Sequence, residues 1–142
     1  MTIIAKRRKY IGSIFIIGIL IALSMVFIGF VQRLFWFSIV FIILSLVCLY
    51  LSMDYAYTPV EILKYDERTK SIVYKNGSIK VTDIEEVKAK KFNDFRGLHF
   101  NVGNLYIKTI NNTIHRFKYI SHVGNAKGII IHLKNNGYLP KE

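Results

Sequence analysis

The chain has 142 residues, a length that suits one modest domain with additional segments and excludes two full domains. Hydrophobic residues make up 52% of the chain, and 20 Lys and Arg against nine Asp and Glu give a formal net charge of +11. All nine acidic residues lie from Asp54 onward, whereas the charges before it are all basic: Lys6, Arg7, Arg8, Lys9 and Arg33. This division predicts an apolar, membrane-type part followed by a water-soluble part, with the boundary near Asp54.

Two long uncharged segments occupy the first third of the chain. Ile11–Val31 and Leu34–Met53 are each as long as the roughly 20 apolar residues that cross a bilayer core. The alternative for the first segment is a cleaved signal peptide, because "KRRK" resembles a basic n-region. Its apolar run exceeds the usual h-region of about 7 to 15 residues, however, and no Ala-x-Ala-like cleavage site follows it. We therefore predict two retained spanning helices, which are antiparallel because only Gln32 and Arg33 join them.

The distribution of basic residues predicts the orientation of this hairpin. Cytoplasmic flanks carry an excess of Lys and Arg, so Lys6–Lys9 against the single Arg33 predicts that both chain ends are cytoplasmic. Trp36 lies beside the turn, where an outer aromatic belt is expected. The predicted location is a cell membrane, crossed twice.

The interior of the two predicted spans carries no ionisable residue. Such residues usually mark ion pathways or substrate sites, so a transporter or channel acting alone is disfavoured and the hairpin is interpreted as an anchor. Gly18 and Ala22 form a small-xxx-small pair that could pack the hairpin or a second copy of the chain. Cys48 lies within a span, without a base or water, and its expected role is packing.

The remaining residues predict a small antiparallel β structure. Apolar and polar positions alternate, and turn signals such as "DERTK", "NG" (Asn76 and Gly77, a type I′ hairpin signal) and "NN" (Asn111 and Asn112) separate the runs. The segment Glu85–Phe92 would also suit a short helix, but a strand is preferred. The predicted strands are Val60–Tyr65, Ser71–Lys75, Ser78–Thr82, Glu85–Phe92, Leu98–Val102, Asn104–Ile110 and Thr113–Ile120.

A helix is predicted after the last strand. Ser121 stands where an N-cap is expected, apolar residues recur at helical spacing from Val123 to Leu133, and Gly137 supplies a stop. The predicted fold class is therefore α+β: residues 1–10 form a basic N-terminus, 11–53 a transmembrane hairpin, and 54–142 a cytoplasmic barrel or sandwich of about seven strands capped by a helix.

At this point the sequence resembles the bacterial pleckstrin-homology-like domains of small membrane proteins, over roughly residues 58–137. The likeness lies in "SIVYKNGSIKVTDIEEVKAKK", in "GNLYIKTINNTIHRFKYI" and in the helix that follows. The motifs are patterns of burial and turns: "I-x-x-V" (Ile84, Val87), "G-x-x-x-I-x-T" (Gly103, Ile107, Thr109) and "F-x-x-I" (Phe117, Ile120).

The resemblance implies a non-catalytic scaffold for proteins, peptides or membrane surfaces. Several small relatives in Gram-positive bacteria are similar to immunity proteins, which protect a producer from its own membrane-active bacteriocin. We therefore expect a membrane-anchored binding module that makes the cell resistant to an antimicrobial peptide of this kind. The alternative is an accessory subunit of an envelope transporter or another membrane complex, binding a partner through an exposed sheet edge. The expected partners are the lipid bilayer and either a membrane-active peptide or a membrane protein complex.

A basic segment with interleaved aromatic residues is the main candidate site. On a cytoplasmic face, each cation near anionic lipid could contribute about 1 kcal/mol of attraction. The alternative is a solvated strand and loop whose lysines prevent edge-to-edge pairing. The candidate residues for binding a membrane surface or a partner are Lys88, Lys90, Lys91, Phe92, Phe95 and Arg96.

The sequence offers little basis for catalysis, metal binding or nucleic-acid binding. The four histidines, His99, His115, His122 and His132, do not have the spacing of a metal set. No phosphate-binding loop or nucleophile motif occurs, so we expect no enzyme and no cofactor. His115 and Asp94 are the nearest acid and base candidates for a lipid-directed enzyme, without support from their spacing. No nucleic-acid-binding module is recognisable, and proximity to a membrane accounts for the positive charge.

Overall fold

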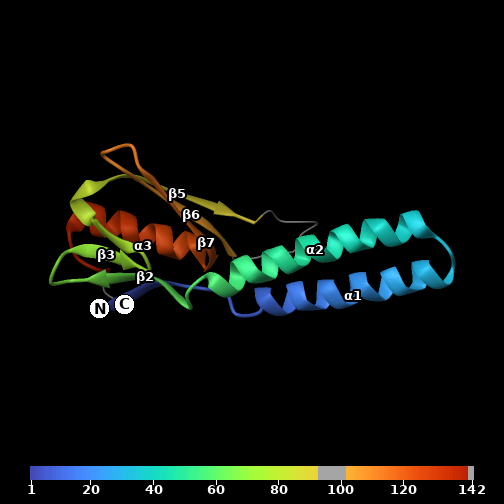
Figure 1. Cartoon of the computed structure of the whole chain (residues 1–142). Helices are drawn as coiled ribbons and strands as arrows, with labels where there is room; N and C mark the ends of the chain where they lie inside the picture. The colour runs from blue at the N-terminus through green and yellow to red at the C-terminus, as the bar shows by residue number, and fades with distance from the viewer. Residues whose placement is uncertain (93–101, 141–142) are drawn as a thin grey trace. The chain divides into compact units, whose positions relative to one another are not determined.

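The computed structural model describes residues 1–92 and 102–140 and divides the chain into two compact units (Figure 1). One unit is a helical hairpin, Lys9–Tyr57. The other unit is discontinuous, because it contains Met1–Arg8 together with the segment that starts at Thr58. The α+β class predicted from the sequence is confirmed.

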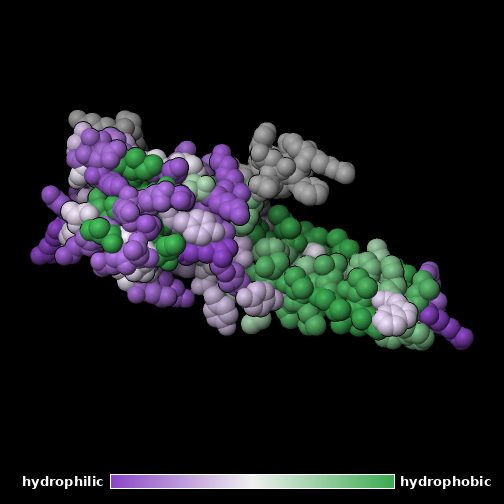
Figure 2. Space-filling model, turned by 90° about the horizontal axis from the view of Figure 1, so that it is seen from above, coloured by the Kyte–Doolittle hydropathy of each residue, from purple (hydrophilic) through white to green (hydrophobic). Residues whose placement is uncertain are grey.

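The hairpin consists of α1 (Ile11–Val31) and α2 (Phe35–Tyr57). The two helices reverse direction through a short turn in which Arg33 adopts a positive φ of 59°. Apolar side chains cover the hairpin surface (Figure 2), and both helices are long and apolar enough to cross a membrane. The helix α2 continues beyond its predicted end at Met53, through Asp54 to Tyr57.

Small residues of α1 bring the two helices together. Ala22 is only 1% exposed, and a Cβ on Gly18 would lie 3.4 Å from the Cys48 sulfur. Near the turn, a Cβ on Gly29 would lie 2.3 Å from the hydroxyl of Ser38. Close backbone approach through small residues is the usual packing of apolar helices. Gly18 and Ala22 therefore serve the packing within the hairpin.

Two antiparallel sheets form the other unit in the described part of the chain. The first sheet has the order β1-β2-β3-β4 and the second the order β5-β6-β7, with a single 3-10 turn, η1 (Val81–Asp83), between them. The strands are β1 (Thr2–Lys6), β2 (Glu61–Asp66), β3 (Ser71–Tyr74), β4 (Gly77–Lys80), β5 (Ile84–Lys91), β6 (Val102–Thr109) and β7 (Ile114–Ser121). The predicted strand Glu85–Phe92 corresponds to β5, which starts at Ile84 and ends at Lys91, one residue before Phe92. Leu98–Asn101 lies outside the described residues, and Val102 begins β6.

The N-terminal strand β1 is not expected from the sequence. It pairs antiparallel with β2, with Ala5 opposite Leu63, although the whole helical hairpin separates the two strands in the chain. Ile4 and Ala5 are 8% and 2% exposed and belong to the hydrophobic core. The predicted basic N-terminus thus contributes a strand, and the hairpin is inserted between the first two strands of one sheet.

The residues after β1 also reach the second sheet. The Arg7 N–H donates to the carbonyl of Val60 at 2.8 Å, and Arg7 forms an isolated bridge with Ile120 in β7. The Arg8 N–H donates to the carbonyl of Tyr119 at 3.0 Å. The segment Arg7–Arg8 therefore connects the β2 side of one sheet to β7 of the other.

One hydrophobic core lies between the sheets and the C-terminal helix α3 (Val123–Asn136), which packs against β5, β6 and β1. The helix buries Val123, Ala126, Ile130 and Leu133, the face that its helical spacing predicts. Most residues of the sequence motifs are buried in this core or beside it: Ile84, Val87, Ile107, Thr109, Phe117 and Ile120.

Two predicted local features are wrong. Ser121 is not the N-cap of α3, because it still pairs with Val102 as the last residue of β7 and His122 caps the helix in a left-handed conformation. The hairpin between β3 and β4 turns at Lys75 and Asn76, and Tyr74 pairs with Gly77. Neither Asn76 nor Gly77 has the positive φ that a type I′ turn requires. The predicted turn at Asn112 (φ 59°) and the stop at Gly137 (φ 74°) are confirmed.

Truncation of a buried β1 side chain tests whether this strand belongs to the core. We expect Ile4→Ala to reduce the free energy of unfolding by about 2–5 kcal/mol, because it removes buried methyl groups. The neighbouring Ile3 is 37% exposed, so Ile3→Ala should change the free energy of unfolding by only about 0.5 kcal/mol. Hydrogen exchange of the β2 amides, measured on the full chain in detergent, reports both values. Equal, small effects would show that β1 does not stabilise β2.

Candidate functional site

A cavity lies on the outer face of the sheet formed by β5, β6 and β7. Leu105 and Ile107 of β6 point into the core, so Asn104 and Tyr106 occupy the opposite face. Cross-strand pairing places Lys90 opposite Asn104 and Arg116 opposite Tyr106. The cavity has a volume of about 340 Å³ and is lined by Lys90, Lys91, Phe92, Asn104, Tyr106 and Arg116.

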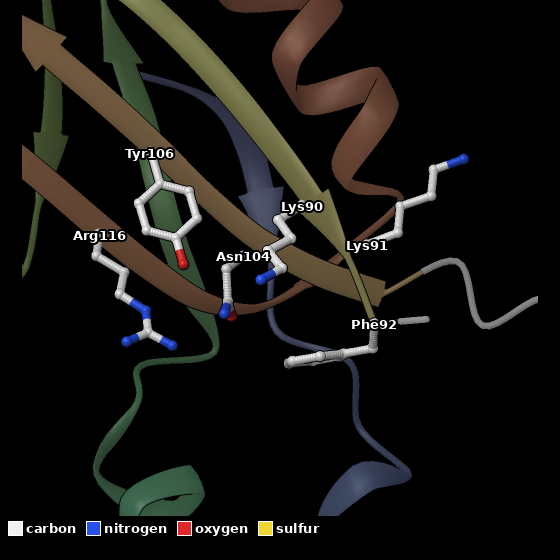
Figure 3. A pocket seen from close by; sticks show the side chains of 6 residues that line it. All are labelled: Lys90, Lys91, Phe92, Asn104, Tyr106 and Arg116. Atoms are coloured by element: carbon white, nitrogen blue, oxygen red, sulfur yellow. The ribbon is translucent and has the colours of Figure 1, made fainter. Parts of the chain in front are cut away.

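Three polar side chains gather beside the ring of Tyr106 (Figure 3). Lys90, Asn104 and Arg116 come from three different strands, and the Arg116 guanidinium lies 5.8 Å from the centre of the Tyr106 ring. This distance allows a cation–π contact, which holds the guanidinium beside the ring. Lys91 extends away from this group, whereas Phe92 lies along its edge. The cavity therefore combines two cations, one amide and aromatic walls.

Asn104 is the most unusual residue of the cavity. It is only 6% exposed, and its Oδ1 atom is buried without a hydrogen-bond partner among the residues that the structure describes. A buried acceptor that has lost water and gained no donor costs about 1–3 kcal/mol. The chain therefore keeps a buried acceptor whose cost is removed if a ligand donates a hydrogen bond to it.

A β-bulge in β7 lies directly opposite Asn104. Gly103 pairs with Ile120 and Leu105 pairs with Phe117, so Lys118 and Tyr119 together oppose Asn104. Tyr119 adopts a positive φ of 58°, an uncommon conformation for a residue with a side chain. Bulges of this kind occur next to functional sites, where they redirect side chains. Here the ring of Tyr119 comes to lie 6.3 Å from the ring of Phe92 at the edge of the cavity.

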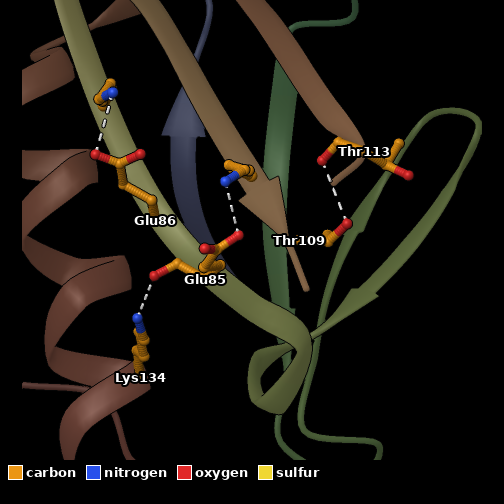
Figure 4. A network of polar contacts seen from close by, with 7 residues as sticks. Glu85, Glu86, Thr109, Thr113 and Lys134 are labelled. Carbon is orange, nitrogen blue, oxygen red and sulfur yellow. Dashed lines mark hydrogen bonds and ion pairs between the residues drawn. The ribbon is translucent and has the colours of Figure 1, made fainter. Parts of the chain in front are cut away.

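Ion pairs neutralise the cations farther along the same sheet (Figure 4). Lys88 pairs with Glu86 at 3.1 Å and Lys108 pairs with Glu85 at 3.0 Å, while Lys134 of α3 donates to the Glu85 carbonyl. By contrast, Lys90 and Arg116 form no ion pair with any residue that the structure describes. Positive charge on this sheet is thus concentrated at the cavity.

The structure brings together part of the basic segment predicted from the sequence. Lys90 and Phe92 line the cavity, Lys91 reaches only its margin, and Lys88 is paired with Glu86. Phe95 and Arg96 lie outside the described residues. Three lining residues were missed by sequence analysis: Asn104, Tyr106 and Arg116. Their alternation along β6 and β7 was visible in the sequence, but the register that places them opposite Lys90 was not.

Several of the residues from which the membrane orientation was predicted also make hydrogen bonds within the structure. The Arg7 guanidinium donates to the Thr58 carbonyl at 2.7 Å, and that of Arg8 donates to the hydroxyl of Ser121 at 3.1 Å. Lys6 ends β1, whereas Lys9 begins the hairpin unit. In the hairpin, Arg33 forms the turn, and Trp36 near it is 84% exposed.

The turn between β2 and β3 contains a carboxylate that shapes it. The hydroxyl of Thr69 donates to Asp66 at 2.9 Å and the backbone N–H of Arg68 donates at 3.1 Å, and both bonds lower the pKa of Asp66. An ionised carboxylate therefore sits at this turn together with Arg68 and Lys70. Such mixed charge makes it a less suitable anion site than the cavity around Asn104.

The histidines do not form a metal site among the described residues. No group of three or more His, Cys, Asp and Glu side chains comes together in residues 1–92 and 102–140. His115 instead contacts Tyr74, whose hydroxyl lies 3.4 Å from its Nδ1 atom. Asp94 and His99 lie outside the described residues.

Comparison with protein-family models, curated protein sequences and solved structures found no match. The interpretation of the cavity therefore rests on its own geometry and charge.

Gly103 permits the close approach of β5 and β6 that places Lys90 opposite Asn104. A Cβ at Gly103 would lie 2.3 Å from the Lys90 carbonyl oxygen, so Gly103→Ala must push the two strands apart. We expect a loss of about 1–3 kcal/mol in the free energy of unfolding. Gly128→Ala is the matched control, because nothing lies within 4 Å of its Cβ position in α3, and should stabilise by about 0.5–1 kcal/mol. Denaturation in detergent measures both, and effects of the same sign would contradict this packing.

Proposed function

We propose that this chain is a membrane-anchored, non-enzymatic binding module. The helical hairpin serves as the anchor, and the cavity around Asn104 serves as the binding site. The observation that carries this proposal is the buried, unpaired Oδ1 of Asn104 beside two cations that have no carboxylate partner in the described part of the chain. Such an arrangement favours ligand binding, because a ligand can satisfy both the acceptor and the charges.

The pairing of β1 with β2 supports one orientation of the proposed anchor. The two strands flank the hairpin in the chain and lie in one sheet, so both ends of the hairpin must emerge on the same side of a membrane. The basic segment Lys6–Lys9 then places this side in the cytoplasm by the positive-inside rule, with Arg33 and Trp36 at the opposite surface. The proposed location is the bacterial cell membrane.

Labelling of single cysteines tests this orientation. In a Cys48→Ser background, we expect Gln32→Cys in the hairpin turn to react with a membrane-impermeant maleimide in intact cells. Ser78→Cys on the exposed part of β4 should react only after permeabilisation. The opposite pattern would place the domain outside the cell, and labelling of both sites in intact cells would contradict a hairpin anchor.

The biological role that we propose for the module is self-immunity, that is, protection of the cell against a membrane-active bacteriocin. This role is supported by the resemblance to bacterial pleckstrin-homology-like membrane proteins, together with a binding site on an anchored domain. Binding would either capture the peptide near the inner surface of the membrane or shield its target there.

A second candidate role is an accessory subunit of an envelope transporter or another membrane complex. One observation favours it: β4 is the last strand in the order of its sheet and pairs with β3 alone among the described strands. An open sheet edge can accept a strand from a partner protein.

A protection assay separates these roles. We expect expression of the chain in a susceptible bacterium to raise the inhibitory concentration of at least one bacteriocin in a panel by tenfold or more. Lys90→Gln/Arg116→Gln should remove this protection, because it removes the cations of the cavity. Arg68→Gln/Lys70→Gln removes the same charge from the β2–β3 turn and should leave protection intact.

Two results of this assay would count against immunity. If the wild-type chain is present in the membrane and protects against no peptide, the accessory-subunit role is favoured. If both double variants protect as well as the wild type, protection does not depend on the cavity.

A further inference from the structure

We propose that the cavity around Asn104 binds a phosphodiester that carries a hydroxyl group, which is the chemistry of a glycerophosphate headgroup. This inference rests on the proposed function as a binding module and names the class of ligand. It follows from three properties of the cavity: its charge, its buried acceptor and its size.

The positive charge of the cavity favours binding of an anion. Lys90 and Arg116 approach it from β5 and β7, on either side of the central strand β6. The acidic residues of the same sheet are already engaged, since Glu86 pairs with Lys88 and Glu85 with Lys108. A phosphodiester has two non-bridging oxygens that share one negative charge, so each cation can donate to one of them, and charge-assisted hydrogen bonds of this kind are about twice as strong as neutral ones.

The buried acceptor, Oδ1 of Asn104, requires a hydrogen-bond donor on the same ligand. The Oδ1 atom of Asn104 cannot accept a hydrogen bond from the oxygens of a phosphodiester, which carry no proton at neutral pH. An ammonium group could donate, but Lys90 and Arg116 line the same cavity and would repel it. A neutral hydroxyl donates without this repulsion. The ligand is therefore an anion with a hydroxyl group, and a zwitterionic headgroup with an amine is disfavoured.

The size and walls of the cavity fit a headgroup. A volume of about 340 Å³ lies at the lower end of the range for small-molecule sites, which is roughly 300–1,000 Å³. Tyr106 and Phe92 supply aromatic surface for the carbon atoms of a short polyol. Phosphatidylglycerol combines these features, and an anchored domain would meet it at the membrane surface. A soluble glycerophosphodiester presents the same groups.

The test compares two lipids that differ only in the hydroxyl groups. The full chain, purified in a neutral detergent, is titrated by calorimetry with dihexanoyl phosphatidylglycerol and with dihexanoyl phosphatidylpropanol, an anionic phosphodiester that keeps the three headgroup carbons but has no hydroxyl. We expect the wild type to bind the glycerol lipid about tenfold more tightly. Asn104→Leu should bind the two lipids equally, because it lacks the acceptor.

A second variant keeps the test informative if Asn104→Leu does not fold. Lys90→Gln/Arg116→Gln changes exposed side chains and should weaken the binding of both lipids by tenfold or more. Arg68→Gln/Lys70→Gln should leave the binding of both lipids unchanged. Deacylated headgroup, glycerophosphoglycerol, then identifies the source of the ligand. Binding at similar strength indicates a soluble glycerophosphodiester, and binding of the lipid alone indicates a membrane lipid.

Three results would overturn the inference. They are equal binding of the two lipids by the wild type, an unchanged preference in folded Asn104→Leu, and binding of an acidic peptide without binding of any phosphodiester. Each would leave the proposed function standing if protection in cells still required Lys90 and Arg116. Conversely, a hydroxyl-dependent preference without protection against any bacteriocin would support the inference and count against immunity.

Discussion

The pairing of β1 with β2 is the constraint on which the rest of the structure depends. These strands are separated in the chain by the whole of Lys9–Tyr57, yet Ala5 and Leu63 lie opposite each other in one sheet. Adjacent strands are about 4.8 Å apart, so the two ends of the helical hairpin are held close together by the domain itself. The burial of Ile4 and Ala5 in the core stabilises this arrangement. The hairpin is therefore an insertion within a folded domain rather than a tail attached to it.

The same N-terminal segment supports the cavity. The Arg8 N–H donates to the carbonyl of Tyr119, the residue that forms the bulge opposite Asn104. A left-handed conformation at a residue with a side chain costs about 1–3 kcal/mol and persists only where its surroundings hold it. The hydrogen bond from Arg8 and the contact with Phe92 are such surroundings. The segment that precedes the hairpin thus helps to shape the site that we propose binds the ligand.

Local patterns predicted much of the fold and less of the site. The two apolar helices follow from the length of their uncharged segments. The strands and the C-terminal helix follow from periodicity, because each buries one face or one stripe. The strand β1 was missed because Thr2–Lys6 is short and is followed directly by basic residues, which indicate the membrane orientation and not a strand. Lys90 and Phe92 were found from composition. Asn104 was not, because its importance depends on the strand register and on a bulge, and no local sequence pattern encodes either one.

The cavity around Asn104 is the feature on which the proposed role depends, and its occupancy can be measured directly. The side-chain amide of Asn104 gives an NMR signal in the isotope-labelled full chain, reconstituted in nanodiscs of phosphatidylcholine with or without phosphatidylglycerol. We expect phosphatidylglycerol to shift this signal and to slow the hydrogen exchange of its amide protons, while the Asn76 side chain in the β3–β4 turn stays unchanged. Identical Asn104 signals in both membranes would contradict a headgroup site in this cavity.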